Sequence, residues 1–259
     1  MNKNIVFIHG MFQNAKSWDN WVAYFSERGY RCVAPSWPDH AGEPVQLRAN
    51  PPATLGDLSL DDVIAAMEQE VLAADRPIVI GHSVGGLLAQ IFVNRNLVSR
   101  AVAISPVAPN KMMTLDWSFF KNVTAIANPL EGNSYFEQTS EKFHAEFCNT
   151  LSETEALQAF GQTATHDSRK VLRDCLGSSG HIDLDTPHVP IAFISGTEDR
   201  IIPHELVEKN SEAYKDAASQ RAYRAFEGRS HFICGEPGWE EVAEYVYNWL
   251  QLQPTSVPA

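Results

Sequence analysis

The chain has 259 residues, 44% hydrophobic and 20% charged, which is typical of a globular protein that can bury a sizeable core. Its formal net charge of −12 argues against nucleic acid or an anionic membrane surface as partner, because both require clustered Lys and Arg. No stretch approaches the roughly 18 consecutive apolar residues of a membrane span. The sequence shows no signal-peptide pattern and its four cysteines have no CxxC spacing, so we expect a cytoplasmic protein with reduced thiols.

Short strand-like runs, most of them apolar, alternate along the chain with longer amphipathic stretches. The short runs predict strands at residues 5–8, 31–34, 77–80, 101–104, 191–194 and 221–226. The amphipathic stretches predict helices at residues 18–25, 60–72, 87–93, 205–214 and 239–250. Residues 39–56 are polar and rich in Pro and predict a loop, while the tail 253–259 is expected to fray. This alternation favours an α/β fold with a mostly parallel, doubly wound sheet and helices on both faces.

The alternation is interrupted after the predicted strand that ends near Ile104. Residues 107–185 contain no clear strand, and helical patterns occur near residues 115–126, 141–148, 153–160 and 168–176. We therefore expect a helical cap at residues 107–185, inserted into a core domain formed by residues 1–106 and 186–259.

Large apolar side chains are frequent in the expected cap. They are Met112, Met113, Leu115, Trp117, Phe119, Phe120, Tyr135, Phe136, Phe143, Phe147 and Phe160. We expect most of them to form the cap's own core and its contact with the sheet domain. The alternative is that some line an adaptable apolar pocket for an acyl or alcohol group.

The motif Gly81-His82-Ser83-Val84-Gly85 lies between a predicted strand and the helix that follows it. Gly-x-Ser-x-Gly in this position is typical of a tight strand-to-helix turn that presents the serine hydroxyl at the top of a sheet. The turn also aims the following N–H groups at the group that the serine attacks. The motif therefore predicts that Ser83 is a nucleophile; the alternative is a plain glycine-rich turn.

A serine nucleophile needs a base that is oriented by a third group. In an open α/β sheet the candidates follow the carboxyl ends of strands. Asp199 follows the predicted strand 191–194 and His231 follows 221–226, which gives the order Ser, Asp, His. We predict that Asp199 orients His231, with Glu198 as the reserve acid. The alternatives are a helix-capping Asp199 and an exposed loop His231.

The other histidines are weaker candidates for the base. His82 flanks the serine, where the motif allows any residue, and His9 is expected to make a structural contact. The remaining ones, for which we expect ordinary surface or capping roles, are His40, His144, His166, His181, His188 and His204.

The oxyanion formed by acyl transfer needs two hydrogen-bond donors. We assign one to the backbone N–H of Val84, the residue after the nucleophile. The second is assigned to the backbone N–H of Met11, because His9-Gly10 allows the loop after the first strand to approach closely.

Together these motifs resemble those of the α/β-hydrolase superfamily. The motifs that carry the resemblance are His9-Gly10, Gly81-His82-Ser83-Val84-Gly85-Gly86, Gly196-x-x-Asp199 and Gly228-Arg229-Ser230-His231-Phe232. The resemblance extends over essentially the whole chain and implies an α/β-hydrolase fold, a Ser-His-Asp hydrolase with a covalent acyl-enzyme, and no cofactor or metal. Within the superfamily the chain looks closest to small bacterial esterases of the non-haem haloperoxidase type, and its start also resembles plant methylesterases and hydroxynitrile lyases.

Two departures from the family pattern lie outside the triad. The first hairpin is missing, and the loop after the second strand has Trp37-Pro38-Asp39-His40 where relatives often have a plainer Pro-Gly-His-Gly. Ser83 argues against epoxide hydrolases and haloalkane dehalogenases, which carry aspartate as nucleophile. Phe232 disfavours a plant-type hydroxynitrile lyase, which carries lysine after the histidine.

The sequence therefore predicts a serine esterase that cleaves a small to medium, mainly apolar carboxylic ester. The same triad also allows thioester, lactone, amide or carbon–carbon cleavage, or perhydrolysis. An alternative of another class is a ligand-sensing protein with slow turnover. The expected partner is a small-molecule substrate, with no nucleic acid or membrane, and the protein is expected to be a monomer or homodimer.

Overall fold

A six-stranded parallel sheet organises the chain. The computed structural model describes residues 3–109, 112 and 126–252. The strands are β1 (Asn4–Ile8), β2 (Arg31–Val33), β3 (Ile78–His82), β4 (Arg100–Ile104), β7 (Ile191–Gly196) and β8 (Arg221–Phe226). Their order is β2-β1-β3-β4-β7-β8, and every neighbouring pair is parallel. The predicted doubly wound α/β architecture and its six strands are confirmed.

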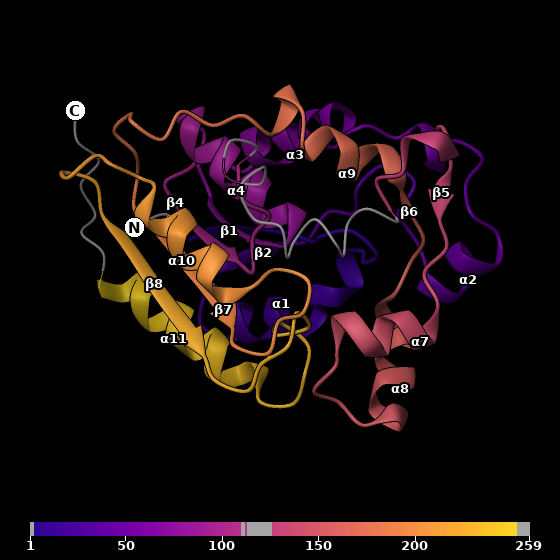
Figure 1. The fold of residues 1–259 in the computed structure, drawn as a ribbon. Coiled ribbons are helices and arrows are strands. Elements are labelled where there is room, and N and C mark those ends of the chain that lie inside the picture. The colour runs from indigo at the N-terminus through magenta and orange to yellow at the C-terminus, as the bar shows by residue number, and fades with distance from the viewer. Residues whose placement is uncertain (1–2, 110–111, 113–125, 253–259) are drawn as a thin grey trace.

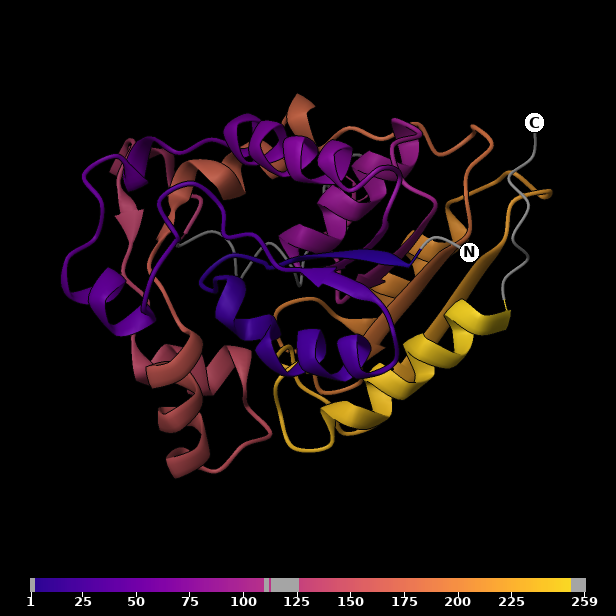
Figure 2. The same cartoon turned by 180° about the vertical axis from the view of Figure 1, so that it is seen from behind.

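Helices cover both faces of the sheet (Figures 1 and 2). One face carries α1 (Asp19–Glu27), preceded by the 3₁₀ turn η1 (Ala15–Trp18), and α11 (Trp239–Leu252). The other carries α3 (Leu60–Ala73), α4 (Val84–Asn94) and α10 (His204–Glu212). Successive strand side chains point to opposite faces, so Ile5 and Phe7 pack with the first group and Val6 and Ile8 with the second.

The strand order changes direction at β1, so the sheet has a topological switch point between β1 and β3. β2 pairs with one side of β1 and β3 with the other, so the loops after β1 and β3 leave the same edge side by side. A crevice forms at such a switch point, outside the carboxyl ends of the strands. Residues 9–12 and 83–85 meet there.

The segment between β4 and β7 contains short elements that Figure 1 shows at one end of the sheet. Its described elements are η3 (Pro129–Glu131), β5 (Tyr135–Phe136), α7 (Ser140–Lys142), the π-helical turn η4 (Phe143–Phe147), α8 (Glu153–Thr163), β6 (Asp167–Ser168), α9 (Arg169–Cys175) and η5 (Ser178–Gly180). The predicted helix at 115–126 lies almost entirely outside the described residues, as does the tail 253–259.

Two expectations about this fold were wrong. β5 and β6 pair antiparallel where no strand was expected, because two-residue strands are too short to show a period of two. The expected loop 39–56 contains α2 (Pro44–Ala49) and the 3₁₀ turn η2 (Leu55–Asp57). Pro44 is the first residue of α2, where proline is favoured because its missing N–H has no intrahelical partner.

Glycines allow β3 to pass into α4 with a one-residue turn. A Cβ on Gly81 would lie 2.0 Å from the carbonyl oxygen of Gly85, and one on Gly85 would lie 2.2 Å from the carbonyl oxygen of Ile8. Both clashes are with backbone, which cannot move aside without displacing β1 or α4. The close approach of β1, β3 and α4 therefore requires glycine at these positions.

We expect Gly81→Ala to abolish the native turn, since its Cβ would overlap backbone, and to lower the free energy of unfolding by several kcal/mol. Gly161→Ala is the matched control, because Gly161 lies inside α8 with nothing within 4 Å of the added Cβ. This control should raise stability by about 0.5–1 kcal/mol. Urea unfolding measures both, and equal effects of the two substitutions would contradict the steric account.

Candidate active site

Ser83 occupies a backbone conformation that is unusual for a residue with a side chain. Its φ is 56° and its ψ is −119°, at the N-cap of α4. Such a conformation costs of order 1–3 kcal/mol and persists only when its surroundings determine it. The Ser83 N–H donates to the Ile104 carbonyl at 2.9 Å, and the Ser83 carbonyl accepts from the N–H groups of Gly86 and Val107 at 2.9 and 3.0 Å. These bonds hold the turn and leave the hydroxyl facing a pocket.

His231 and Asp199 form a buried hydrogen-bonded pair at the ends of β8 and β7. Nδ1 of His231 lies 2.7 Å from Oδ2 of Asp199, and both side chains are at most 1% exposed. Oδ1 of Asp199 accepts from the N–H groups of Ile201 and Ile202 at 2.9 and 2.8 Å. Because the carboxylate is fixed on both oxygens, it orients the imidazole so that Nε2 is the free nitrogen.

His231 and Ser83 line the same pocket, so the structure brings together the three side chains that the sequence singled out. Glu198 is different, because its side chain is exposed to solvent. It therefore does not share the buried position of Asp199.

Two further buried groups support the loop that carries His231. Nε2 of His82 donates to the His231 carbonyl at 2.8 Å, and burial followed by the neighbouring His231 lowers the pKa of His82 well below its usual value. The buried carboxylate of Glu236 accepts from the N–H and the hydroxyl of Ser230 and from the hydroxyl of Thr150. Neither role was predicted from the sequence.

The pocket is mainly apolar. Its described lining residues are Met11, Phe12, Ser83, Val84, Val107, Ile126, Phe136, Gln138, Glu146, Phe147, Leu172, Ile201, Ile202 and His231. The Phe147 ring lies edge-on to the His231 imidazole, with ring centroids 4.9 Å apart. Phe136 and Phe147 thus face the pocket.

Other aromatic side chains of the expected cap have packing roles. Phe143 and Phe160 pack with Phe232 of the sheet domain, and Tyr135 stacks on His166. Residues 113–120 lie outside the described residues. Among the described aromatic residues of the expected cap, some therefore line the pocket and others pack in the core. Both roles that the sequence left open are present.

The loop after β1 passes directly beside the serine. A Cβ on Gly10 would lie 2.6 Å from Cβ of Ser83, so only glycine allows this approach. The N–H of Met11 donates to no described backbone or side-chain group, and the N–H of Val84, the first residue of α4, has no intrahelical partner. Met11 and Val84 line the same pocket as Ser83, and neither backbone N–H has a hydrogen-bond partner among the described residues.

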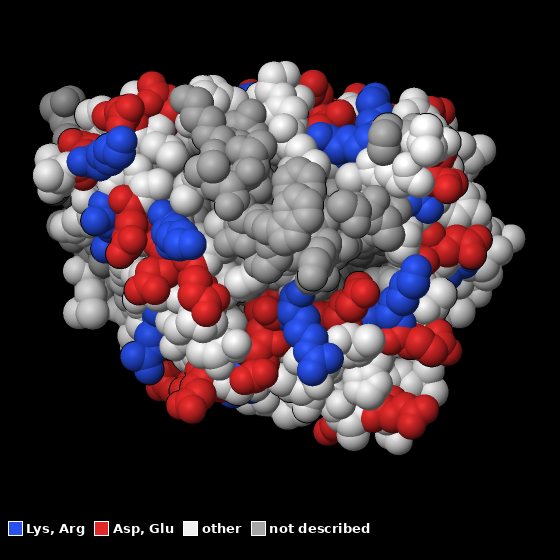
Figure 3. Space-filling view, in the orientation of Figure 1, with Lys and Arg blue, Asp and Glu red and all other residues white. Residues whose placement is uncertain are grey.

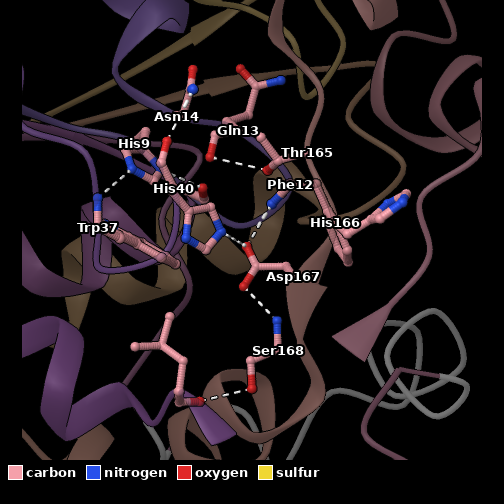
Figure 4. A network of polar contacts seen from close by, with 12 residues as sticks. His9, Phe12, Gln13, Asn14, Trp37, His40, Thr165, His166, Asp167 and Ser168 are labelled. Atoms are coloured by element: carbon pink, nitrogen blue, oxygen red, sulfur yellow. Dashed lines mark hydrogen bonds and ion pairs between the residues drawn. The ribbon is translucent and has the colours of Figure 1, made fainter. Parts of the chain in front are cut away.

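A network of buried polar groups also holds this loop (Figure 4). Oδ2 of Asp167, at the start of β6, accepts from the N–H of Phe12 at 2.8 Å and lies 3.3 Å from Nε2 of His40. The Phe12 carbonyl accepts from the N–H of Thr165 at 3.0 Å. Phe12 has a φ of 62°, a left-handed conformation that these bonds stabilise.

The contacts of His40 favour its protonated form. Its Nδ1 lies 2.8 Å from the Pro38 carbonyl, which only accepts, so Nδ1 is protonated while Nε2 faces the Asp167 carboxylate. Burial lowers the pKa of His40, but Asp167 and the Pro38 carbonyl outweigh burial and the pKa is raised. Both side chains are at most 1% exposed. The expectation of an ordinary surface or capping histidine at position 40 was wrong.

His9 remains neutral beside this pair. Its Nδ1 lies 2.9 Å from the Gly10 carbonyl, and its Nε2 accepts from the N–H of Trp37 at 3.1 Å. Burial, followed by the charge of His40, lowers the pKa of His9 to about 3. His9 makes the structural contact that the sequence suggested, and it fixes the carbonyl that precedes Met11.

Within the described residues, no group of three or more His, Cys, Asp or Glu side chains is arranged to hold a metal ion. No described helix has the length and apolar character needed to cross a bilayer. On the face shown in Figure 3, the visible Lys and Arg side chains are scattered among Asp and Glu rather than joined in one patch.

The chain belongs to the alpha/beta hydrolase family, whose profile matches residues 5–245. It is similar to a non-heme chloroperoxidase of Streptomyces lividans, with 25% identity over 248 residues that cover 88% of this chain and 84% of the relative. Its fold is similar to that of a Paleococcus ferrophilus monoacylglycerol lipase, with a TM-score of 0.68, 18% identity and coverage of 95% and 93% of the two chains. Tomato methylketone synthase I, solved with 2-tridecanone, gives a TM-score of 0.71 at 15% identity, with coverage of 97% and 98%.

We expect Asp167→Asn to lower both stability and catalytic rate. In the wild type, Oδ2 of Asp167 accepts from the N–H of Phe12 and Oδ1 accepts from the N–H of Ser168 at 2.7 Å. An asparagine has only one side-chain oxygen, so one of these two N–H groups loses its acceptor. The substitution also removes the negative charge that faces His40. Breaking a buried pair in this way costs about 3–5 kcal/mol, measured by urea unfolding at pH 6. The loosened Met11 donor should lower kcat by about tenfold or more.

The stability difference between Asp167→Asn and the wild type should depend on pH. Because the pKa of His40 is raised, the pair's contribution is complete below the unfolded pKa of about 6.5 and is lost as the pH rises through the folded pKa. Asp174→Asn is the control: the Asp174 carboxylate also joins this segment to the core, by accepting from the N–H of Leu60, and it makes no hydrogen bond to the described residues of the loop after β1. A loss of kcat in the control as large as in Asp167→Asn would contradict the account.

Proposed function

We propose that the protein is a serine hydrolase that cleaves a small to medium, mainly apolar carboxylic ester through Ser83, His231 and Asp199. The observation that carries the proposal is the 2.7 Å hydrogen bond between His231 and Asp199, beside an apolar pocket that His231 and Ser83 both line. Membership of the alpha/beta hydrolase family and a likeness in fold to a lipase support hydrolysis as the reaction type.

In this proposal the Ser83 hydroxyl oxygen attacks the ester carbonyl carbon while its proton passes to Nε2 of His231. The carbonyl oxygen becomes an oxyanion and accepts hydrogen bonds from the N–H groups of Met11 and Val84. The imidazolium then gives its proton to the leaving alcohol oxygen, and the carbon–oxygen bond of the ester breaks. Water, deprotonated by the same imidazole, releases the acid and restores the serine. Asp199 keeps the imidazole in the required tautomer throughout.

The lining of the pocket supports an uncharged, mainly apolar substrate. Apolar side chains from the sheet domain and from the inserted segment surround Ser83, and none of the described lining residues is Lys or Arg. Among the described lining residues, an anionic acyl chain would find no counter-charge and would find the carboxylate of Glu146. A neutral ester of short to medium chain length is therefore the preferred class.

A second reaction on the same triad is perhydrolysis, in which hydrogen peroxide rather than water accepts the acyl group. Similarity to a non-heme chloroperoxidase favours this candidate over the other bond types that the triad allows. The test adds hydrogen peroxide to the esterase assay and measures peracid. Peracid formation that is lost in Ser83→Ala supports perhydrolysis, and hydrolysis without peracid excludes it.

Labelling with a fluorophosphonate tests the proposed nucleophile. We expect one adduct per chain by intact mass, mapped to Ser83 by peptide analysis, because the probe reacts with an activated serine. His231→Ala should block labelling, since without its base the hydroxyl is a poor nucleophile.

Steady-state kinetics on p-nitrophenyl esters test whether the residues act as a unit. Ser83→Ala and His231→Ala should lose about the same activity, with unfolding curves close to that of the wild type. A His231→Ala variant with near wild-type kcat would show that the base is wrongly assigned. Folded wild-type protein that neither labels nor turns over would instead favour a ligand-sensing protein.

A further inference from the structure

Gln138 is a buried polar residue in the wall of the pocket, and the proposed triad chemistry gives it no task. The extended stretch after β5 alternates buried and exposed residues: Phe136 and Gln138 are buried, while Glu137 and Thr139 are exposed. Successive side chains of an extended chain point to opposite sides, so Gln138 shares the pocket-facing side with Phe136. A glutamine therefore occupies a position where the alternation favours an apolar side chain.

The side-chain amide of Gln138 makes no hydrogen bond to a described residue. The residue is 7% exposed, and its one hydrogen bond runs from the backbone N–H to Nδ1 of His166 at 3.2 Å. An amide in an apolar wall costs more desolvation than an apolar side chain of similar shape, so the apolar side chain would be preferred on stability alone. The amide faces the cavity that Ser83 and His231 line, where a bound molecule would supply its partner.

The other polar residues that line the pocket do not offer a second buried neutral group that could bind such a molecule. Ser83 and His231 belong to the proposed triad, and the side chain of Glu146 is exposed at the rim. Gln138 is thus the one buried neutral polar side chain among the described lining residues that is outside the triad. An amide both donates and accepts, so it pairs with a carbonyl or hydroxyl group and does not require a charge.

We propose that Gln138 determines specificity by hydrogen bonding a carbonyl or hydroxyl group of the substrate, so that the preferred ester carries such a group away from the scissile bond. This inference rests on the proposed function, which it narrows from apolar esters to neutral esters with one further polar group. An ester that lacks this group leaves the amide unpaired and binds more weakly.

The test compares matched esters with and without a ketone. One pair differs in the acid, p-nitrophenyl 4-oxopentanoate against p-nitrophenyl pentanoate, and the other in the alcohol, 4-oxopentyl acetate against pentyl acetate. Gln138→Met keeps the shape of the side chain and removes the amide. We expect the ratio of kcat/KM for ketone over plain ester to fall about tenfold in this variant for at least one pair.

Glu137→Gln is the matched control, since it changes the adjacent exposed residue on the opposite side of the same stretch. Its ratios should equal those of the wild type. The thermal midpoint of Gln138→Met should stay the same or rise, because the unpaired amide is gone. A midpoint several degrees lower would mean that the amide has a structural role, and ratios unchanged within about twofold in both pairs would also overturn the proposal.

Calorimetry in a Ser83→Ala background separates this proposal from the proposed function. There the uncleaved esters report binding alone, and adding Gln138→Met should remove the preference for the ketone ester. Preserved ketone preference in a wild-type protein that never turns over would refute the hydrolase and retain the Gln138 subsite. If the wild type turns over and Gln138→Met changes neither the kcat/KM ratio nor the binding preference, the hydrolase proposal stands and the Gln138 proposal is refuted.

Discussion

The close approach of three backbone segments is the constraint on which the site depends. β1, β3 and the first turn of α4 meet at distances that exclude a Cβ on Gly10, Gly81 and Gly85. The approach forces Ser83 to a φ of 56° and brings its hydroxyl beside the loop that follows β1. A residue in this conformation presents its side chain and its following N–H groups on the same side, which is the geometry that acyl transfer requires.

Buried polar contacts then hold the loops near Ser83 that the close backbone packing does not constrain. Asp167 and Thr165 hold the N–H and the carbonyl of Phe12, and Thr150 bonds the Glu236 carboxylate beneath the His231 loop. The segment between β4 and β7 therefore does more than line the pocket, because it bonds to the loops on both sides of Ser83. A buried charge pair is costly to break, so the His40–Asp167 contact favours one arrangement of the loop over many.

Much of the sheet domain could be predicted from the sequence. Four of the six strands contain a short apolar run, at residues 5–8, 78–80, 101–104 and 191–194. The Gly-x-Ser-x-Gly motif was enough to nominate Ser83, and the strand-end rule was enough to nominate Asp199 and His231. Their chemical roles stay predictions. The expectation for His82 was incomplete because the motif allows any residue there, whereas the fold uses its ring to hold the His231 carbonyl.

The rest depends on tertiary contacts that leave no local pattern. His40 and Asp167 meet only when the loop after β2 and the start of β6 pack together, and no spacing in the sequence links them. Asp167 also lies in a two-residue strand, which is too short for its period to be recognised. Gln138 stands out only after the fold shows which side of its stretch is buried. Such residues become informative once a buried polar group must be given a partner.

The most direct test of the central claim is a crystal structure of the protein after reaction with diethyl p-nitrophenyl phosphate. We expect a phosphoryl group on the Ser83 oxygen, with the phosphoryl oxygen about 2.7–3.1 Å from the N–H groups of Met11 and Val84. We also expect that His231 keeps its bond to Asp199 and turns Nε2 toward the adduct. An adduct whose phosphoryl oxygen points away from both N–H groups, or one on another residue, would contradict this claim.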